Sequence, residues 1–417
     1  MPTKKDVETF LAAYQPEVRD VVCAARRLCL LTVTLVAASS FACNDRNTAS
    51  TVGRGEPPKA ATLEAEFDAL VPKLLAEKGV PGVSIAVVQG GKITLEKAYG
   101  LADKAKKKPV TSQTRFQIGS ISKTLAAWAV MTLVDRGQVE LDAPIDRYLK
   151  RWHLPKSEFD SNKVTVRRLL SHTSGLSVYP SEDVAIDDKS PPLEVALSRD
   201  RGTAYGRLRV VRSPGTGYEY NNGNYTIIQL LIEDVTGEGF GPYLRRTILD
   251  PLGMKDSGYD WSANLRAVVA TPHRENGTAL PHYQYRNQEA SGGLYTTALD
   301  LARFVAAAMS GTDDAKVGRG VLKPETISQL LRPALNTDGM HTLCYKVMPV
   351  SKDVRLISHN GANPGWRSTF MFHPESGNGI VILTNSDVGG RIVGQIVMAW
   401  AEHAGIDMSE LRKGTPK

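Results

Sequence analysis

The sequence predicts an α+β fold: an α/β sandwich with an inserted helical subdomain, whose antiparallel sheet is flanked by helices from the N- and C-terminal ends of the body. Strand-like segments gather near the start of the body and again near its end. Residues 116–335 between them are mostly helical and are broken by Gly, Pro, Ser and Asn loops. With 417 residues, 42% of them hydrophobic, the chain can bury a large core.

The body opens with an amphipathic helix, which we expect over residues 62–78. Thr62 is its candidate N-cap, glutamates in the first turn favour the helix dipole, apolar side chains recur on one face, and Gly79 ends it. Pro72 lies inside this pattern. Because proline lacks the N–H that a helix interior needs, it predicts a kink or a split into two helical pieces.

Two hairpins supply the main strands of the predicted sheet. Residues 83–88 and 93–99 flank a Gly-Gly pair that suits a tight turn. Near the other end of the body, residues 366–372 and 380–384 are separated by a loop containing Pro and Gly. A helix is expected over 391–404, so the body opens with helix, strand and strand and closes with strand, strand and helix.

These segments predict one main domain over residues 61–410. Its mixed α/β part is formed by residues 61–115 and 336–410, and its helical part by residues 116–335. Because a cleft between a sheet and an insertion is the usual place for a ligand, we expect the functional site there.

Charge and cysteine content narrow the function classes. The formal net charge is +7, but Lys and Arg alternate with Asp and Glu, so we expect no nucleic-acid partner. The densest basic stretch, residues 104–108, follows a predicted hairpin and is interpreted as a solvated turn. Because Cys23, Cys29 and Cys43 lie near the start, the body cannot form an internal disulfide. Its Cys344, in an apolar run, is interpreted as a buried small hydrophobe.

The N-terminal region predicts export. Residues 26–42 combine an arginine pair, an apolar run too short to span a bilayer comfortably, and small residues before Cys43, which is typical of a signal peptide. A cysteine at the new N-terminus is similar to the lipobox of bacterial lipoproteins. We expect a periplasmic protein or one anchored to the membrane through lipidated Cys43, with residues 43–60 as a flexible linker. Residues 1–25 form an atypical extension, interpreted either as the product of a misassigned start codon or as a helical segment.

Ser120 and Lys123 form the first chemical motif. They precede an apolar helical stretch over residues 124–135, so Ser120 is expected at a helix N-terminus, where N–H groups favour the negative charge of an attacking oxygen. Lys123, three residues later, lies on the same helix face as the serine. If it is buried, its pKa falls toward that of a useful base. A lone Ser-x-x-Lys also fits a serine N-cap beside an exposed lysine.

A Gly-rich loop over residues 214–222 carries the second motif, Tyr220 and Asn222, just before an apolar helix over 225–235. A phenol in this position can shuttle protons if a neighbouring ammonium lowers its pKa, and an amide two residues later can bind a substrate carbonyl. Taken alone, the pair is uninformative, because Tyr and Asn are common in turns.

The third motif, His359-Asn360-Gly361-Ala362, precedes the predicted strand over 366–372. Gly361 lets a substrate approach the backbone closely, and the N–H of Ala362 can act as a second oxyanion donor beside that of Ser120. His359 supplies a polar or cationic contact. Taken alone, it is better explained as a surface histidine.

Together and in this order, the three motifs resemble those of the serine β-lactamase and penicillin-binding-protein superfamily, in which Ser-x-x-Lys, Tyr-x-Asn and Lys/His-x-Gly line one cleft. Residues 164–176, 250–254 and 291–297 are also similar to that family, and the resemblance covers about residues 62–405. It implies that His172, within the first of these stretches, is structural. Neither Gly-x-Ser-x-Gly nor His-Glu-x-x-His occurs, which argues against an α/β-hydrolase or a zinc hydrolase of the zincin type.

The resemblance implies an acyl-enzyme route that needs no cofactor and no metal. The implied catalytic residues are Ser120, Lys123 and Tyr220. The implied substrate-binding residues are Asn222, His359, Gly361 and Ala362.

The substrate stays open at this point. Where efficient class C β-lactamases carry a lysine for the substrate carboxylate, this chain has His359, and a neutral imidazole attracts that anion less. We therefore expect a carboxylesterase of β-lactamase fold. The alternatives are a D-aminopeptidase or DD-carboxypeptidase acting on cell-wall-type peptides, a weak class C-like β-lactamase, and a non-catalytic penicillin-binding or sensing protein. The expected ligand is thus a small ester, a D-amino-acid peptide or a β-lactam, in a pocket shaped by residues 177–197 and 278–289.

Overall fold

The structure is a computed structural model, and the residues that it describes are 62–179, 184–185, 190–200, 206–311, 315–351 and 354–408. The predicted extension (1–25), signal peptide (26–42) and linker (43–60) lie outside these residues. Among the helices of the described ranges, none combines the length and the apolar character needed to cross a membrane.

The chain divides into two compact units. The smaller one contains the start of helix α3 (Leu63–Lys78) and most of helix α13 (Gly390–His403), and within it His403 Nε2 lies 2.8 Å from a Glu66 carboxylate oxygen. The larger unit, Val71–Val393, contains the sheet and every predicted site residue.

Helix α3 runs through Pro72 without interruption, so the predicted split at this residue is wrong. Phe67, Val71 and Leu74 on either side of the proline are buried. Burial of an apolar face stabilises the helix by more than one missing backbone hydrogen bond destabilises it.

A seven-stranded antiparallel sheet forms the larger unit's framework, in the order β3-β2-β1-β11-β10-β9-β8. The strands are β1 (Gly82–Gln89), β2 (Lys92–Asp103), β3 (Lys108–Pro109), β8 (Lys346–Pro349), β9 (Arg355–Asn363), β10 (Trp366–His373) and β11 (Asn378–Thr384). Ile85 of β1 pairs with Ile382 of β11, so the centre of the sheet joins the early and the late hairpins. This arrangement confirms the predicted antiparallel sheet.

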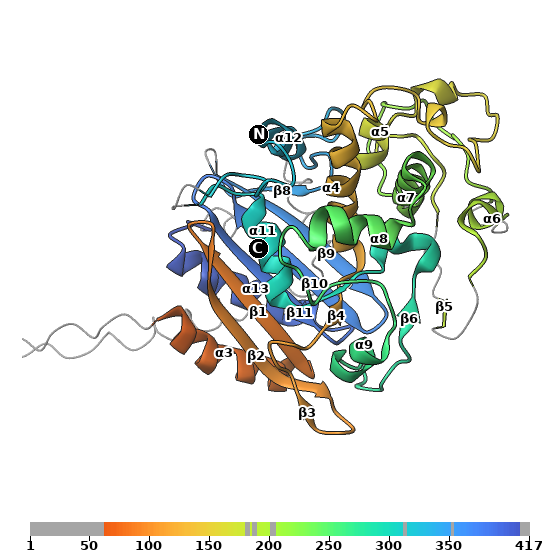
Figure 1. The fold of residues 1–417 in the computed structure, drawn as a ribbon. Helices are drawn as coiled ribbons and strands as arrows, with labels where there is room; N and C mark the ends of the chain where they lie inside the picture. Colours follow the sequence, from red (N-terminus) through yellow and green to blue (C-terminus); the bar gives the residue numbers. More distant parts are fainter. Residues whose placement is uncertain are drawn as a thin grey trace, which may run out of the picture. The chain divides into compact units, whose positions relative to one another are not determined.

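Helices cover this sheet and form the insertion between its strands (Figure 1). Helix α11 (Ala298–Ala307) packs against β1, β2 and β11, and α4 (Ser122–Asp135) packs against α7 (Asn222–Thr236), α8 (Phe240–Leu244) and α10 (Glu289–Gly292). The remaining helices are α5 (Val166–Leu170), α6 (Leu193–Ser198), α9 (Ala263–Val268) and α12 (Pro324–Leu331). The mixed helical and antiparallel-sheet architecture confirms the predicted fold class.

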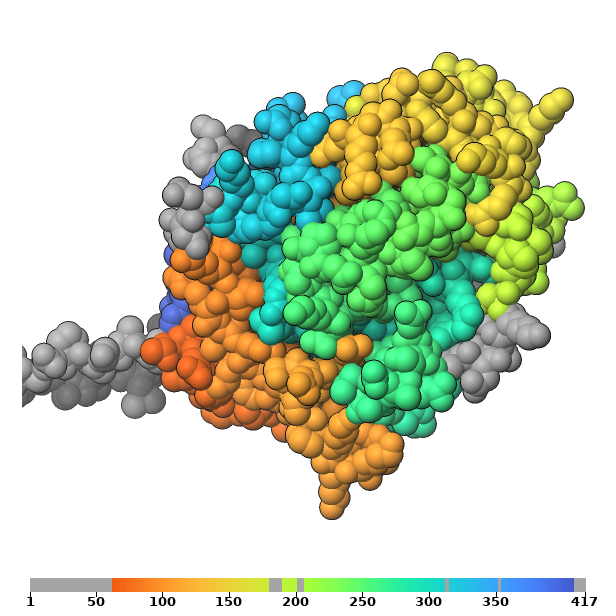
Figure 2. Space-filling model, viewed as in Figure 1, coloured from red at the N-terminus to blue at the C-terminus, as the bar shows by residue number. Residues whose placement is uncertain are grey.

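Shorter elements connect these layers. Two small antiparallel pairs are β4 (Phe116–Gln117) with β7 (Tyr295–Thr296), and β5 (Val184–Ala185) with β6 (Tyr283–Gln284). Tight helical turns are η1 (Gly119–Ile121), η2 (Ile145–Arg147), η3 (Ser161–Lys163), the π-helical η4 (Arg245–Leu249) and η5 (Arg286–Gln288). Figure 2 shows the same view as a space-filling model, in which the green surface of residues 240–260 lies between the orange surface and the yellow surface of residues 150–179.

One hydrophobic core connects the sheet with α4. The Trp128 indole donates a hydrogen bond of 2.8 Å to the Tyr345 hydroxyl, and the Tyr345 ring packs edge-on against Phe370 and Phe372 of β10. Cys344 is buried beside them, as predicted, and desolvation raises the pKa of its thiol. Because burial fixes these side chains, α4 is held rigidly above β9 and β10.

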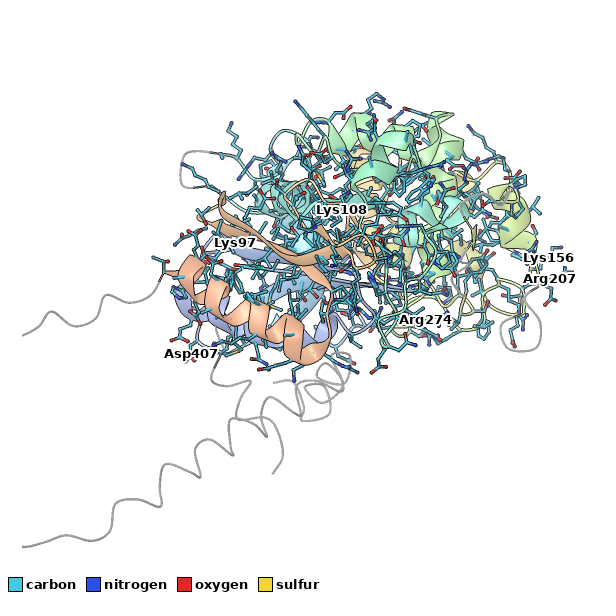
Figure 3. The ribbon with its side chains drawn as sticks, turned by 90° about the horizontal axis from the view of Figure 1, so that it is seen from below. Lys97, Lys108, Lys156, Arg207, Arg274 and Asp407 are labelled. Atoms are coloured by element: carbon cyan, nitrogen blue, oxygen red, sulfur yellow. The ribbon has the colours of Figure 1, made fainter. Side chains whose placement is uncertain are left out.

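Residues 104–107 form the predicted turn between β2 and β3. The Lys106 side chain is 80% exposed and pairs with Asp103 at 3.4 Å. Lys108 donates a hydrogen bond to the Ala267 carbonyl, and Figure 3, seen from below, labels it near the end of this hairpin, far from Lys156 and Arg207. The basic stretch is therefore a solvated turn.

Candidate active site

Ser120 lies in η1, between the short strand β4 and helix α4. Gly119 has φ +52°, a conformation that favours glycine, and a Cβ on it would lie 2.7 Å from the Ala362 nitrogen. Neither η1 nor α4 has a side-chain N-cap, and Ser120 is half-buried. The serine is therefore presented at the start of α4 and does not cap it, which removes the interpretation of Ser120 as a simple helix cap.

Lys123 is fully buried one turn along α4, and it is not the exposed lysine of the alternative interpretation. Its Nζ lies 2.8 Å from Asn222 Oδ1, 2.7 Å from the Ser291 carbonyl oxygen and 3.1 Å from Ser120 Oγ, so an uncharged amine donates to the first two oxygens and accepts from the Ser120 hydroxyl. None of these three partners is a carboxylate. Desolvation therefore lowers the pKa of the amine well below its ordinary value, and a neutral amine next to a hydroxyl can accept its proton.

Tyr220 approaches the same two residues from the loop before α7. Its ring centroid lies 5.0 Å from Lys123 Nζ, and its hydroxyl shares a hydrogen bond with Ser120. The expectation that a neighbouring ammonium lowers the pKa of the phenol is wrong. Although 37% of the side chain is exposed, burial around the hydroxyl raises the pKa of Tyr220, and the hydrogen bond with Ser120 opposes this shift only in part. Tyr220 therefore stays protonated and can pass a proton without becoming a phenolate base.

His172 fixes the loop that carries Tyr220 and Asn222. Its Nδ1 accepts hydrogen bonds from the Asn221 backbone N–H (3.1 Å) and the Asn224 amide (3.0 Å), and its ring lies 4.5 Å from that of Tyr220. Asn221 Oδ1 caps α7 by accepting from the Gly223 N–H at 2.9 Å. His172 thus has the structural role that the family resemblance implied.

Strand β9 brings the third motif against η1. A Cβ on Gly361 would lie 1.8 Å from the Ile118 carbonyl oxygen, and Ser368 of β10, paired with Gly361, donates a 2.7 Å hydrogen bond to the same oxygen. Only glycine permits this approach. Because Ala362 also lies against Gly119, the residue before Ser120, the backbone segments that carry the two candidate oxyanion donors lie side by side.

His359 is 2% exposed and is not the surface histidine of the isolated interpretation. Burial lowers the pKa of His359 well below its ordinary value, and the charge of Lys346 adds to this shift, so the polar contact applies and not the cationic one. Its Nδ1 donates to the Asn360 carbonyl at 2.8 Å, which leaves Nε2 as the hydrogen-bond acceptor of a neutral ring. His359 therefore offers a lone pair where a lysine would offer a charge.

The three predicted motifs thus meet at Ser120, and two further residues complete the site. Ser291 belongs to a family-like stretch, but its carbonyl contact with Lys123 depends on the fold. Lys346 pairs in β8 with Ser358, next to His359, and also lies in a bridge with His341. Its charge lowers the pKa of both histidines. Only the pairing of β8 with β9 could have identified it, and no sequence motif marks it.

Comparisons with known proteins give consistent matches. A family model described as Beta-lactamase matches residues 67–403. Protein flp of Staphylococcus aureus (strain N315) is 24% identical over 332 residues, which are 77% of this chain and 63% of that protein, so the chain spans less than two thirds of this relative. Esterase EstB of Burkholderia gladioli is 31% identical over 235 residues, covering 54% of this chain and 56% of that protein. The octameric penicillin-binding protein homologue from Pyrococcus abyssi has a TM-score of 0.66 and 25% identity, over 83% of this chain and 78% of that one.

Proposed function

Because this chain belongs to the Beta-lactamase family, we propose that it is a serine hydrolase that forms an acyl-enzyme on Ser120 and acts best on neutral carboxylic esters. The observation that carries the proposal is the pair formed by Ser120 and the buried Lys123, whose Nζ lies 3.1 Å from the serine hydroxyl. A buried, uncharged amine at this distance is the activated form that nucleophilic catalysis by serine requires.

In the first half-reaction, neutral Lys123 accepts the Ser120 proton while Oγ attacks the ester carbonyl carbon. The carbonyl π electrons move onto its oxygen, which the backbone N–H groups of Ser120 and Ala362 stabilise. When the carbonyl re-forms, the alkoxide leaves and takes a proton from the Lys123 ammonium through the Tyr220 hydroxyl. The acyl group is then bound to Ser120, and the relay is neutral again.

In the second half-reaction, water attacks the acyl carbonyl and gives a proton to the same Lys123 and Tyr220 pair. The tetrahedral intermediate collapses and expels Ser120 Oγ, which recovers its proton from Lys123. The product is the carboxylic acid. Throughout, Asn222 holds Lys123 in place through the 2.8 Å hydrogen bond to its Oδ1.

Substrate preference follows from His359. The neutral ring presents an acceptor, so it attracts a hydroxyl or amide N–H of the substrate and gives no favourable contact to a carboxylate. Penicillins and D-alanyl peptides both carry a free carboxylate on the side of the leaving group. An ester with an uncharged leaving group avoids this loss, which favours esterase activity over β-lactam hydrolysis.

A second function has one observation in its favour. Lys346 acts electrostatically on His359 and His341, so a cation lies near the place where a substrate carboxylate would bind. This favours a D-peptidase acting on cell-wall-type peptides as the alternative. A weak β-lactamase or a protein that acylates without turnover requires the same Ser120 chemistry.

A panel of p-nitrophenyl esters, D-Ala-D-Ala peptides and nitrocefin separates these functions. We expect the esters to have the highest kcat/KM. Rapid peptide turnover with inert esters would reverse the preference. Stoichiometric labelling by penicillin with no turnover of any substrate would indicate a sensing protein. A Ser120→Ala variant that kept full activity would contradict the whole assignment.

Export is a separate part of the proposal. Residues 26–42 have the composition of a signal peptide and Cys43 that of a lipidation site. The mass of the protein recovered from a bacterial membrane fraction tests both. Cleavage before Cys43 with added diacylglycerol supports anchoring, and an unmodified full-length chain contradicts export.

A further inference from the structure

A second cavity, of about 390 Å³, lies away from the Ser120 hydroxyl in the helical part of the larger unit. Four aromatic residues line it, namely Tyr259, Trp261, Tyr285 and Tyr295. A volume of this size is within the range of small-molecule sites, about 300–1,000 Å³. The proposed mechanism assigns no step to this cavity, although its lining residues between 284 and 289 belong to the segment 278–289 that was expected to shape the substrate pocket.

Carboxylates set the electrostatics of its wall. Glu289 and Asp260 both line the cavity. Burial raises the pKa of Glu289 to about 8, and the negative charges of Glu233 and Asp260 add to this shift. Arg286 also lines it, and its charge lowers the pKa of Glu289 by less than the other causes raise it. The cavity wall therefore carries more acid than base.

The Tyr259 hydroxyl is the second unusual group. It is buried and, among the residues that the structure describes, has no hydrogen-bond partner. A buried hydroxyl without a partner normally destabilises a fold by about 1–3 kcal/mol, so a ligand that supplies the missing interaction would bind favourably.

One backbone segment separates this cavity from the catalytic serine. A Cβ on Gly292 would lie 3.9 Å from the Gly119 carbonyl carbon, whereas one on Gly293 would lie 3.2 Å from Tyr285 Cβ and 3.5 Å from Tyr259 Cδ1. The same segment holds the Ser291 carbonyl, which accepts the hydrogen bond from Lys123. The segment 291–293 therefore contacts both the catalytic residues and the residues that line the cavity.

We propose that this cavity is a second binding site, which takes an organic cation: an ammonium group attached to an apolar body. The faces of Trp261 and the tyrosines attract a cation, the Glu289 carboxylate neutralises it, and the aromatic lining covers the apolar part. An anion would be repelled by the carboxylates of Glu289 and Asp260. A neutral apolar ligand would remove water from the Glu289 carboxyl group and offer it neither a charge nor a hydrogen bond.

Benzyltrimethylammonium is the probe that tests this site, because its charge does not change with pH. Isothermal titration calorimetry on the whole protein should give one binding site, with benzyl alcohol binding at least about tenfold more weakly. Between pH 6.5 and pH 9 the affinity should rise about tenfold or more, since Glu289 must lose its proton to form the carboxylate.

Variants locate the site. Glu289→Gln should abolish the pH dependence and weaken binding about tenfold at pH 9, and Trp261→Leu should also weaken it. Glu158→Gln, an exposed glutamate, is the matched control and should leave binding unchanged. Labelling of Ser120 by a fluorophosphonate at the normal rate shows that the variants keep their fold.

The decisive comparison uses protein whose Ser120 has first been blocked by the fluorophosphonate. Blocked protein should bind the cation as well as free protein does. Loss of binding on blocking would place the cation in the catalytic cleft, and equal binding by Glu289→Gln would place it elsewhere. Either result overturns the proposal, as does the absence of saturable binding. None of these binding results bears on the proposed esterase activity, which is measured separately by ester hydrolysis.

Discussion

Replacing Gly361 by alanine tests the contact that joins β9 to the nucleophile. The added Cβ would lie 1.8 Å from the Ile118 oxygen and 2.3 Å from Ser368 Oγ. Because such atoms do not approach within about 3 Å, the Ile118 carbonyl has to retreat by about 1 Å, and it is backbone next to Gly119 and Ser120. A displacement of this size at a reacting group lowers the rate about 100-fold.

The assay is single-turnover acylation by p-nitrophenyl acetate, with thermal unfolding measured on the same samples. We expect about a 100-fold slower acylation and a loss of about 1–3 kcal/mol of stability from overpacking. Gly217→Ala, on the loop before Tyr220 but with no atom within 4 Å of the added Cβ, should change neither quantity much. Adding Ser368→Ala relieves only the hydroxyl contact, so it should not restore the rate. Wild-type acylation by folded Gly361→Ala would refute the reasoning.

The remaining predictions concern side chains. Lys123→Met should lower kcat/KM for an ester by at least about 100-fold, measured on protein that thermal unfolding shows to be folded at pH 7. In the wild type, hydrolysis should be lost as the pH falls through the lowered pKa of Lys123. The free energy of unfolding should rise with pH between the pKa of Lys123 in the folded protein and its higher pKa in the unfolded chain, because the unfolded chain binds more protons in this range. Lys123→Met should show a flatter dependence of stability on pH. His359→Lys should raise the kcat/KM ratio of D-Ala-D-Ala peptide to neutral ester about tenfold, and an unchanged ratio would mean that His359 does not face the substrate's carboxylate. His172→Phe leaves the Asn221 and Asn224 donors unpaired, so stability should fall by about 1–3 kcal/mol in chemical denaturation, together with kcat.

Sequence patterns within a few residues were sufficient to predict the turns and loops whose conformation is set by residues close together in the chain. The Gly-Gly hairpin between β1 and β2, the turn over residues 104–107 and the loop before α7 all follow from turn chemistry and periodicity. The meeting of Ser120, Tyr220 and Gly361 could be predicted only through the family resemblance, since no local rule brings them together.

The errors arose where long-range packing decides the outcome. His359 is buried because β8 and β10 flank its strand, and this burial lowers its pKa, with a further contribution from Lys346 on the neighbouring strand β8. The pKa of Tyr220 is raised by the burial of its own hydroxyl. The cavity beside α10 combines residues from three separate segments, and only the fold brings these segments together.

The central pairing of β1 with β11 also constrains how the protein can be made. Seven of the eight residues of β1 are buried, yet its partner strand is synthesised almost at the end of the chain. During synthesis, the early hairpin therefore presents an unpaired apolar edge for nearly the whole of translation, and pairing over so long a separation is slow. A ribosome that stops before β11 would release a chain prone to aggregation through that edge.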